Sequence, residues 1–312
     1  MAKVTVVGAG NVGSNTTRRI AEKGIADEVV MIDIVEGLPQ GLALDINQSA
    51  PVEGFSARVT GTNDYSDTAR SDVAVITAGL ARQPGMSRMD LLGKNAEIVG
   101  SVTEQLVEQS PDAVVIVVSN PLDEMTYLAA LISGLPKPRV MGMAGVLDSS
   151  RLRSFIAEKL DVVPASVEAV TLGSHGDQMV ALPRHATVDG KPLPDLLGPA
   201  ELDELFARTR DAGAEIVGYL KKGSAFYAPS SSAAAMVAAV VADSDAVMPT
   251  CAWTTGEYGV SDVYLGVPAR LGRGGVKEIV ELELNADELG RLREAAEAIR
   301  SKCTELEKTR DT

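Results

Sequence analysis

The stretch VTVVGAGNVG, residues 4–13, decides the fold of this chain. A β-branched run leads directly into Gly8, Gly10 and Gly13, which have the spacing G-x-G-x-x-G. Such glycines permit a tight turn, close approach of the backbone to a pyrophosphate, and packing of a helix against the sheet. The helix N-terminus adds amide N–H groups and a positive dipole. The stretch therefore predicts a strand, a phosphate-binding turn and a helix.

An acidic residue at the end of the next β-branched run, EVVMID (28–33), supports this interpretation. Asp33 lies 20 residues after Gly13, where a carboxylate accepts hydrogen bonds from ribose hydroxyls. Its charge would repel a 2′-phosphate, and residues 34–36 supply no Arg to neutralise one. We therefore expect the cofactor NAD rather than NADP.

The first half repeats this rhythm of short apolar runs and helical segments. The runs are continuous rather than alternating in polarity, which is typical of parallel strands covered on both faces. They are KVTVVG (3–8), EVVMID (28–33), ARVTG (57–61), DVAVITAG (72–79), AVVIVVSN (113–120) and RVMGM (139–143), with helical spacing over 11–23 and 90–109. The pattern predicts an α/β Rossmann domain, a doubly wound parallel sheet, over residues 1–145.

The second half has α+β character and is expected to form a substrate-binding and catalytic domain over residues 146–312. Asp189-Gly190 is a hairpin signal, and Gly223 separates two expected helices within 201–242. Further expected elements are a helix over 148–160, a strand EAVTLG (168–173), an antiparallel group TCAWTT (250–255), VYLGVPARLG (263–272) and GVKEIVELEL (275–284), and a closing helix over 286–308.

Composition narrows the function classes. Of 312 residues, 45% are apolar and 23% charged, as in globular proteins, and the net charge of -14 argues against nucleic acid or an anionic membrane as partners. An acidic surface of this size fits either solubility or life at high salt. No apolar run is long enough to span a membrane. Cys251 and Cys303 lack metal-ligand spacing, so we expect buried thiols, no metal and a cytoplasmic setting.

Two histidines are the candidates for a general acid or base near neutral pH. His185 lies next to Arg184 in an expected strand and is interpreted as a surface residue. His175 follows an apolar strand in the loop GSHGDQ, where Gly173 and Gly176 allow close approach to a ligand. A catalytic role and a structural one remain equally open for His175 on composition alone.

Three other polar clusters follow predicted strands. Asp148 and Arg151 are three residues apart at a helix start, either sharing one face or serving as an N-cap and a solvated cation. Arg82 and Arg88 lie in a polar loop that could close as a lid or be merely solvated. Asn120 ends a strand, and the following proline forces a turn that could contain a cis peptide.

Five of these motifs together resemble the lactate/malate dehydrogenase family in order and spacing. They are GAGNVG (8–13), ARQPGMSR (81–88), VSNPLD (118–123), GMAGVLDSSR (142–151) and LGSHGD (172–177). GLPQGLALD (37–45) resembles the branch of lactate-dehydrogenase-like malate dehydrogenases. The resemblance spans nearly the whole chain. It implies NAD-dependent interconversion of (S)-malate and oxaloacetate, a reaction of the tricarboxylic acid cycle.

The resemblance also implies roles for individual residues. His175 corresponds to the proton donor and acceptor, Asp148 to its orienting carboxylate and Arg88 to a catalytic lid cation that polarises the carbonyl. The substrate-binding set is Arg82, Arg88, Asn120 and Arg151. The cofactor-binding set is Gly8, Ala9, Gly10, Asn11, Val12, Gly13, Asp33, Asn95, Val118, Ser119 and Asn120.

Two alternative functions stay open, and an oligomeric state is expected. A lactate dehydrogenase, or another 2-hydroxy acid dehydrogenase, differs in the residue at position 82, where malate enzymes resemble one another in carrying Arg and lactate enzymes carry Gln. A regulator that senses NAD could use the same glycine turn but would not need His175, Asp148 and Arg151. The resemblance further implies a homo-oligomer, a tetramer for this branch or else a dimer.

Overall fold

The computed structural model describes residues 1–80 and 88–310, without the side chains of residues 88–90, 309 and 310. Strands and helices alternate along the first part of the chain. They are β1 (Lys3–Val7), α1 (Asn11–Glu22), β2 (Glu28–Ile32), α2 (Leu38–Glu53), β3 (Arg58–Thr62), β4 (Val73–Ile76), α3 (Arg88–Gln109), β5 (Val114–Val117), α4 (Leu122–Ser133) and β6 (Val140–Gly142).

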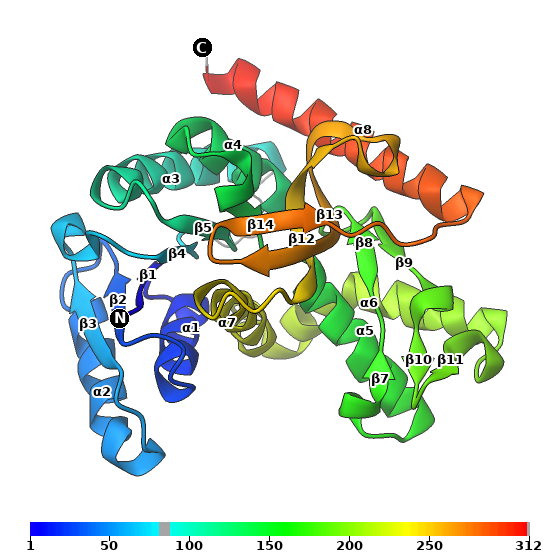
Figure 1. Ribbon diagram of the computed structural model, residues 1–312, viewed down its shortest axis with the longest axis horizontal. Coiled ribbons are helices and arrows are strands. Elements are labelled where there is room, and N and C mark those ends of the chain that lie inside the picture. Colours follow the sequence, from blue (N-terminus) through cyan, green and yellow to red (C-terminus); the bar gives the residue numbers. More distant parts are fainter. Residues whose placement is uncertain (81–87, 311–312) are drawn as a thin grey trace.

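These strands pair in parallel in the order β3-β2-β1-β4-β5-β6. The order reverses between β1 and β4, and a crevice at the carboxyl ends of strands is the usual ligand site at such a point. Helices α1 and α7 lie on one side of the sheet and α3 and α4 on the other (Figure 1). The prediction of a doubly wound parallel sheet is confirmed.

The second part of the chain extends the same sheet with antiparallel strands. Its elements are α5 (Gly145–Leu160), β7 (Val167–Glu168), β8 (Thr171–Gly173), β9 (Met179–Ala181), β10 (Thr187–Val188), β11 (Lys191–Pro192), α6 (Pro199–Leu220), α7 (Tyr227–Val241), β12 (Val247–Thr255), β13 (Ser261–Gly272), β14 (Gly275–Ile279) and α8 (Ala286–Arg310). The sheet continues from β6 through β12, β13 and β8 to β9, and β14 pairs with β13. The prediction of a second part with α+β character after the parallel sheet is confirmed.

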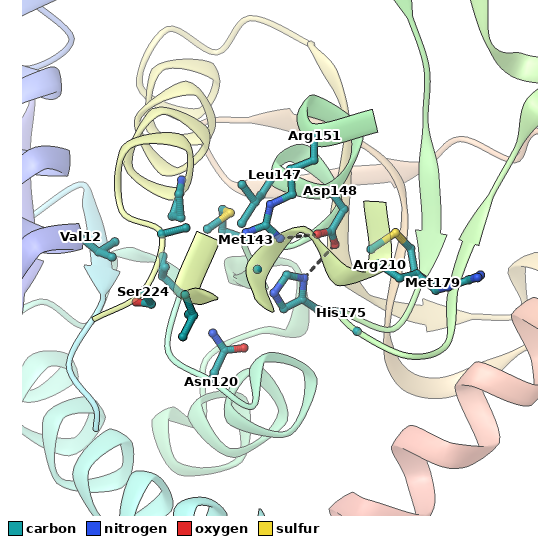
Figure 2. Close-up of a pocket in the computed structure, with 16 residues that line it drawn as sticks. Val12, Asn120, Met143, Leu147, Asp148, Arg151, His175, Met179, Arg210 and Ser224 are labelled. Atoms are coloured by element: carbon teal, nitrogen blue, oxygen red, sulfur yellow. Dashed lines mark hydrogen bonds and ion pairs between the residues drawn. The ribbon is translucent and has the colours of Figure 1, made fainter. Parts of the chain in front are cut away.

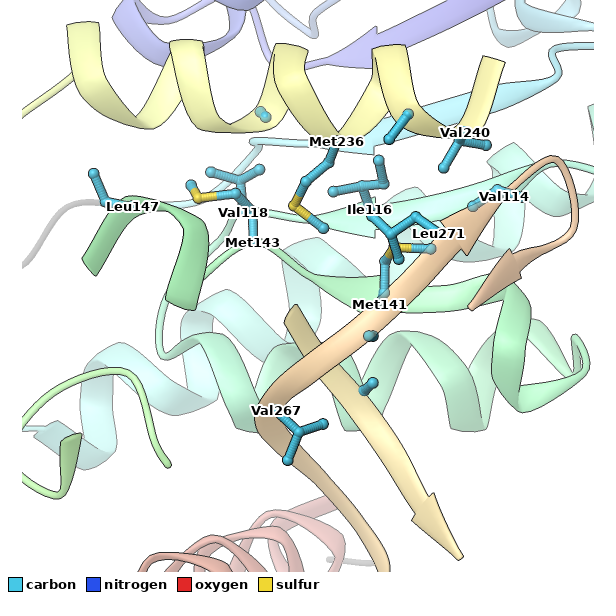
Figure 3. Close-up of a cluster of buried hydrophobic side chains, with 14 of the residues drawn as sticks. Val114, Ile116, Val118, Met141, Met143, Leu147, Met236, Val240, Val267 and Leu271 are labelled. Carbon is cyan, nitrogen blue, oxygen red and sulfur yellow. The ribbon is translucent and has the colours of Figure 1, made fainter. Parts of the chain in front are cut away.

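One apolar core spans both parts of the chain. Val114 and Ile116 of β5 pack with Met236 and Val240 of α7, and Leu271 of β13 joins them (Figure 3). A helix from the second half therefore covers the sheet of the first half. The division into domains 1–145 and 146–312 stays a prediction.

Several local expectations differ from the structure. The expected strand 168–173 is split, because β7 pairs with β10 in a small second sheet while β8 pairs with β13 and β9 in the large one. His185 is not in a strand but ends the 3-10 turn Pro183–His185, since proline cannot donate to a strand ladder. The strand expected over 275–284 ends at Ile279, and the helix α2 was not expected.

Other local expectations are confirmed. Asp189 and Gly190 have φ angles of 48° and 77° in the turn between β10 and β11, as a type I′ hairpin requires. Helices α6 and α7 stand on either side of Gly223. The Asn120-Pro121 peptide is cis, and both cysteines are free and buried.

Short 3-10 turns complete the described part of the chain: η1 (Tyr65–Thr68), η2 (Lys137–Arg139), η3 (Pro164–Ser166), η4 (Pro183–His185), η5 (Leu193–Asp195) and η6 (Glu257–Gly259). Within residues 1–80 and 88–310, no helix is both long enough and apolar enough to cross a membrane.

The glycine turn packs α1 tightly against β1. A Cβ atom on Gly13 would lie 1.8 Å from the carbonyl oxygen of Gly8, so only glycine permits this approach. Gly8 itself has a φ of 102°. A Cβ on Gly10, in contrast, would meet no atom within 4 Å and would project into open space. Gly13 therefore serves the fold, while Gly10 leaves room above the helix for a ligand.

We predict that two alanine substitutions affect different properties, one the stability of the fold and the other the binding of NADH. Gly13→Ala should lower the free energy of unfolding by about 1–3 kcal/mol or more, because the backbone must move to accept the new atom. Gly10→Ala should unfold at the wild-type temperature but bind NADH more weakly, since its Cβ would occupy the space for the pyrophosphate. Thermal unfolding and NADH fluorescence titration measure the two effects. Equal melting temperatures for both variants would contradict this division of roles.

Candidate active site

Asp33 ties the glycine turn to the second strand. Its Oδ2 accepts a hydrogen bond from the Ala9 N–H at 2.6 Å, and its Oδ1 accepts one from the Val35 N–H at 2.9 Å. A carboxylate has about four acceptor positions, so about two remain for ribose hydroxyls. Residues 34–36 are exposed and carry no positive charge. The charge at this site therefore favours a cofactor without a 2′-phosphate.

The start of α1 is open to an anion. Gly10 is the N-cap residue, no side chain caps this end, and no acidic residue lies in the first turn, which begins with Asn11 and Val12. Helix N-termini of this kind bind phosphate through their free amide N–H groups. Together with the space beside Gly10, this arrangement fits the pyrophosphate of a dinucleotide.

Asn95 holds the ends of two central strands together. This residue of α3 is 1% exposed, and its Oδ1 accepts a hydrogen bond from the Leu80 N–H at 2.7 Å. Its Nδ2 donates to the carbonyl oxygens of Leu80 at 3.1 Å and Asn120 at 2.6 Å. Ser119 adds a bond from its Oγ to the Ala78 carbonyl oxygen at 2.5 Å. These bonds fix the loops that border the crevice, and direct cofactor contacts by Asn95 and Ser119 stay predictions.

His175, Asp148 and Arg151 come together in space (Figure 2). The Nδ1 atom of His175 lies 2.8 Å from Oδ2 of Asp148, and Nη1 of Arg151 lies 3.5 Å from Oδ1 of the same carboxylate. Asp148 is 2% exposed in the first turn of α5. The interpretation of Asp148 as a helix cap and Arg151 as a solvated cation is wrong, because the half-buried guanidinium of Arg151 faces the buried carboxylate of Asp148.

The loop between β8 and β9 carries His175 into this position. Gly173 and Gly176 flank it with φ angles of 86° and 138°, a region that side chains other than glycine rarely adopt. The backbone N–H of His175 donates to Oδ2 of Asp123 at 3.1 Å. His175 is therefore held at two points, at its ring by Asp148 of α5 and at its backbone N–H by Asp123 of α4.

The charges around His175 favour its protonated form. Burial acts to lower the pKa of His175, but the charge of Asp148 and its hydrogen bond outweigh burial and raise this pKa above its usual 6.5. Asp123 acts in the same direction, and Arg151 opposes it. Burial lowers the pKa of the Arg151 guanidinium, which nevertheless stays charged near neutral pH. The group can therefore exchange a proton in the physiological range.

Of the four buried side-chain atoms that have no hydrogen-bond partner within the described part of the chain, two belong to this site. They are Oδ1 of Asp148 and Nε of Arg151. Such atoms are costly to leave unpaired, so a guanidinium with a free N–H beside a cavity is suited to receive a ligand. A carboxylate is the group that matches the planar guanidinium best.

A cavity of about 330 Å³ lies beside these groups. Asn120 borders it below the imidazole, and Val12 borders it from the glycine turn (Figure 2). The lining residues are Val12, Val118, Asn120, Met143, Leu147, Asp148, Arg151, His175, Gly176, Met179, Arg210, Gly213, Val217, Ser224, Ala225 and Pro229. The predicted cofactor turn and the predicted catalytic residues therefore border one space.

The side chains of two predicted residues lie outside the described part of the structure. Arg82 lies outside the described residues, and Arg88 begins α3 with a side chain that is outside the description. His185 does not line the cavity. Its Nε2 contacts the Glu283 carbonyl oxygen at 2.8 Å, which fits the surface position expected for it. Among the described residues no cluster of His, Cys, Asp or Glu could hold a metal ion.

Some lining residues were missed by the sequence analysis. Met179 follows His175 on β9, while Gly213 and Val217 of α6, with Ser224, Ala225 and Pro229 before and within α7, close the far wall. These residues are small or apolar and form no chemical motif. The break between helices expected near Gly223 was the one signal in the sequence for the segment that brings residues 224–229 to the cavity. Asp123 was also missed, although it ends the quoted motif VSNPLD.

A dinucleotide turn, a proton-exchanging imidazole and a half-buried guanidinium around one cavity define a dinucleotide-dependent oxidoreductase. Family profiles agree with this class. Residues 2–142 match the lactate/malate dehydrogenase NAD-binding domain, and residues 145–309 match the alpha/beta C-terminal domain of the same family. The chain belongs to the lactate/malate dehydrogenase family. The predictions of this family and of NAD as cofactor are confirmed.

Individual relatives narrow the comparison. The chain is 54% identical to malate dehydrogenase from Salinibacter ruber over 99% of this chain and 98% of the relative. A solved structure of malate dehydrogenase from that organism, 52% identical, superposes with a TM-score of 0.95, with 99% of each chain covered. Lactate dehydrogenase from Cryptosporidium parvum, solved with lactic acid and nicotinamide adenine dinucleotide, has a TM-score of 0.94 at 40% identity, with 98% of each chain covered.

Proposed function

We propose that this protein is an NAD-dependent malate dehydrogenase that interconverts (S)-malate and oxaloacetate. The observation that carries the proposal is the contact of His175 with the buried Asp148, beside Arg151 and a cavity that reaches the glycine turn. The predicted malate dehydrogenase activity is confirmed by relatives of that name that are 54% and 52% identical to this chain over nearly its full length.

His175 is the proposed general acid and base. Asp148 accepts a hydrogen bond, so Nδ1 keeps its proton in both charge states of the ring. Nε2 is then the atom that takes the hydroxyl proton of malate and returns it to the carbonyl oxygen of oxaloacetate. NAD, when bound, supplies the hydride acceptor at the nicotinamide. The two transfers need one aligned site from which water is excluded.

Arg151 is the proposed anchor for the carboxylate next to the reacting carbon. Its unpaired Nε and one Nη atom form the fork that binds a carboxylate through two parallel hydrogen bonds. Because Asp148 fixes both Arg151 and His175, the anchor and the proton-transfer atom keep a constant relation. The carboxylate position then decides which face of the substrate meets the cofactor.

The remaining roles rest on the family resemblance. Arg88 is proposed to polarise the reacting carbonyl, Arg82 to bind the distal carboxylate of oxaloacetate, and Asn120 to contact the substrate. The proposed cofactor contacts are those of the glycine turn, Asp33, Asn95 and residues 118–120. We further propose a cytoplasmic homotetramer, with a dimer as the alternative.

The competing functions make different demands on the site. A lactate dehydrogenase would not need a cation for a second carboxylate, so Arg82 discriminates between the two substrates. An NAD sensor would not need a histidine paired with a buried carboxylate beside a guanidinium whose Nε has no hydrogen-bond partner, as found here.

We predict that His175→Asn binds NADH normally but loses at least about 10²-fold in kcat/KM, the usual contribution of a positioned proton-transfer group. His185→Asn is the matched control and should be nearly silent. In the wild type, kcat/KM for malate should rise with pH as neutral His175 forms, and kcat/KM for oxaloacetate should fall. Because Asp148 raises the pKa of His175, both midpoints should lie above 6.5. Parallel pH profiles, or equal losses in the two variants, would contradict the assignment.

Substrate choice is predicted to depend on Arg82. Burying a carboxylate without a partner is unfavourable, and a charged hydrogen bond contributes about 1.5 to 3 kcal/mol, roughly 10- to 150-fold. Arg82→Gln should therefore lower kcat/KM for oxaloacetate by about two orders of magnitude and raise it for pyruvate, with NADH affinity unchanged. An unaltered ratio of the two substrates in steady-state assays would exclude this role.

A further inference from the structure

Beneath His175 lies a second buried carboxyl group, Asp123, in the first turn of α4. It is 4% exposed. Its Oδ2 accepts the backbone N–H of His175 at 3.1 Å, and its Oδ1 accepts the S–H of Cys251 at 3.3 Å. Within the described residues no Lys or Arg forms an ion pair with it. Two neutral donors are a weak set of partners for a buried carboxylate.

We propose that Asp123 is a positioning residue for His175, holding the backbone of the histidine loop and placing a second negative charge beside the imidazole. The proposal deepens the proposed function, because it concerns the proton exchange assigned to His175. An asparagine would provide the backbone bond without burying a charge. We therefore infer that the negative charge of Asp123, and not only its hydrogen bond, acts on the imidazole of His175.

The electrostatics of the two groups agree with this geometry. Burial, with a contribution from Glu124, raises the pKa of Asp123 to about 6, while His175 and its backbone N–H act to lower it. Asp123 is therefore mostly ionised where His175 titrates, since the pKa of His175 is raised above 6.5. As the pH falls through about 6, Asp123 takes up a proton and the contribution of its negative charge to the pKa of His175 declines.

The other groups around Asp123 do not replace its charge. Glu124, the next residue of α4, is 3% exposed and pairs with Lys302 of α8 at 3.3 Å. Burial raises the pKa of Cys251 on β12 well above its usual value, and burial raises the pKa of Cys303 on α8 to about 12. Both thiols therefore stay neutral near physiological pH.

Helix α5 supplies the other charged neighbours of the imidazole. Asp148 raises the pKa of His175 and Arg151 lowers it. Asp123 is thus the acidic group that reaches His175 from the Rossmann sheet, through α4, while Asp148 reaches it from α5. His175 therefore contacts carboxyl groups from both halves of the chain, Asp148 at its ring and Asp123 at its backbone N–H.

The test uses the fact that the chain contains only two histidines. NMR titration of the protein labelled at imidazole Cε1 gives one signal for His175 and one for His185, the internal control. Asp123→Asn should lower the His175 midpoint by about half a pH unit or more, because an opposite charge near the ring is lost. Glu124→Gln, the matched control, removes a neighbouring buried charge that faces Lys302 and should leave the midpoint in place.

The wild type provides a second measurement that does not depend on folding of a variant. Its His175 signal should show a second inflection near pH 6, where Asp123 titrates, and the His185 signal should not. A His175 midpoint that is unmoved in Asp123→Asn, or that moves equally in Glu124→Gln, would overturn the proposal. If Asp123→Asn does not fold, the absence of the second inflection in the wild-type His175 signal would overturn the proposal.

Kinetics separate this proposal from the proposed function. In Asp123→Asn, the pH profile of oxaloacetate reduction should move to lower pH together with the NMR midpoint. If the NMR midpoint moves and the kinetic profile does not, the effect of Asp123 on His175 is supported, while the proton-transfer role of His175 fails.

Discussion

The buried carboxylate of Asp148 is the interaction on which the rest of the site depends. One oxygen fixes the imidazole of His175, and the other lies beside the guanidinium of Arg151. Removing a carboxylate from water is costly unless opposite charge and hydrogen bonds surround it. Here His175 gives Asp148 a hydrogen bond and Arg151 gives it an opposite charge. Both residues border one cavity. The same contact raises the pKa of His175 into a range useful for proton exchange.

The fold brings these groups together by extending one sheet through both halves of the chain. β6 ends at Gly142 and α5 begins at Gly145, so the helix that carries Asp148 starts where the parallel strands end. β6 pairs with β12, β12 with β13, and β13 with β8, which leads into the His175 loop. Helix α7 covers the sheet and, at its other end, borders the cavity. Cofactor turn and catalytic groups are therefore parts of one packed body.

Much of this architecture could be predicted from the sequence because its signals are local. Continuous apolar runs gave the parallel strands, and Gly8, Gly10 and Gly13 gave the turn. His175, Asp148 and Arg151 were singled out as residues, but their contact is a long-range fact that spacing alone left open. The split of residues 168–173 between two sheets depends on pairing partners distant in sequence. Asp123 was overlooked because a lone acid after a proline has no pattern that reveals its burial beneath a histidine.

The most direct test of this account is kcat/KM for oxaloacetate reduction by Asp148→Asn, measured beside NADH affinity and melting temperature. The substitution keeps the shape of the side chain but removes the charge shared by His175 and Arg151. We expect a loss of at least about 10²-fold, with NADH affinity unchanged in a folded protein. A folded variant with near wild-type kcat/KM would contradict the claim that this one carboxylate organises the site.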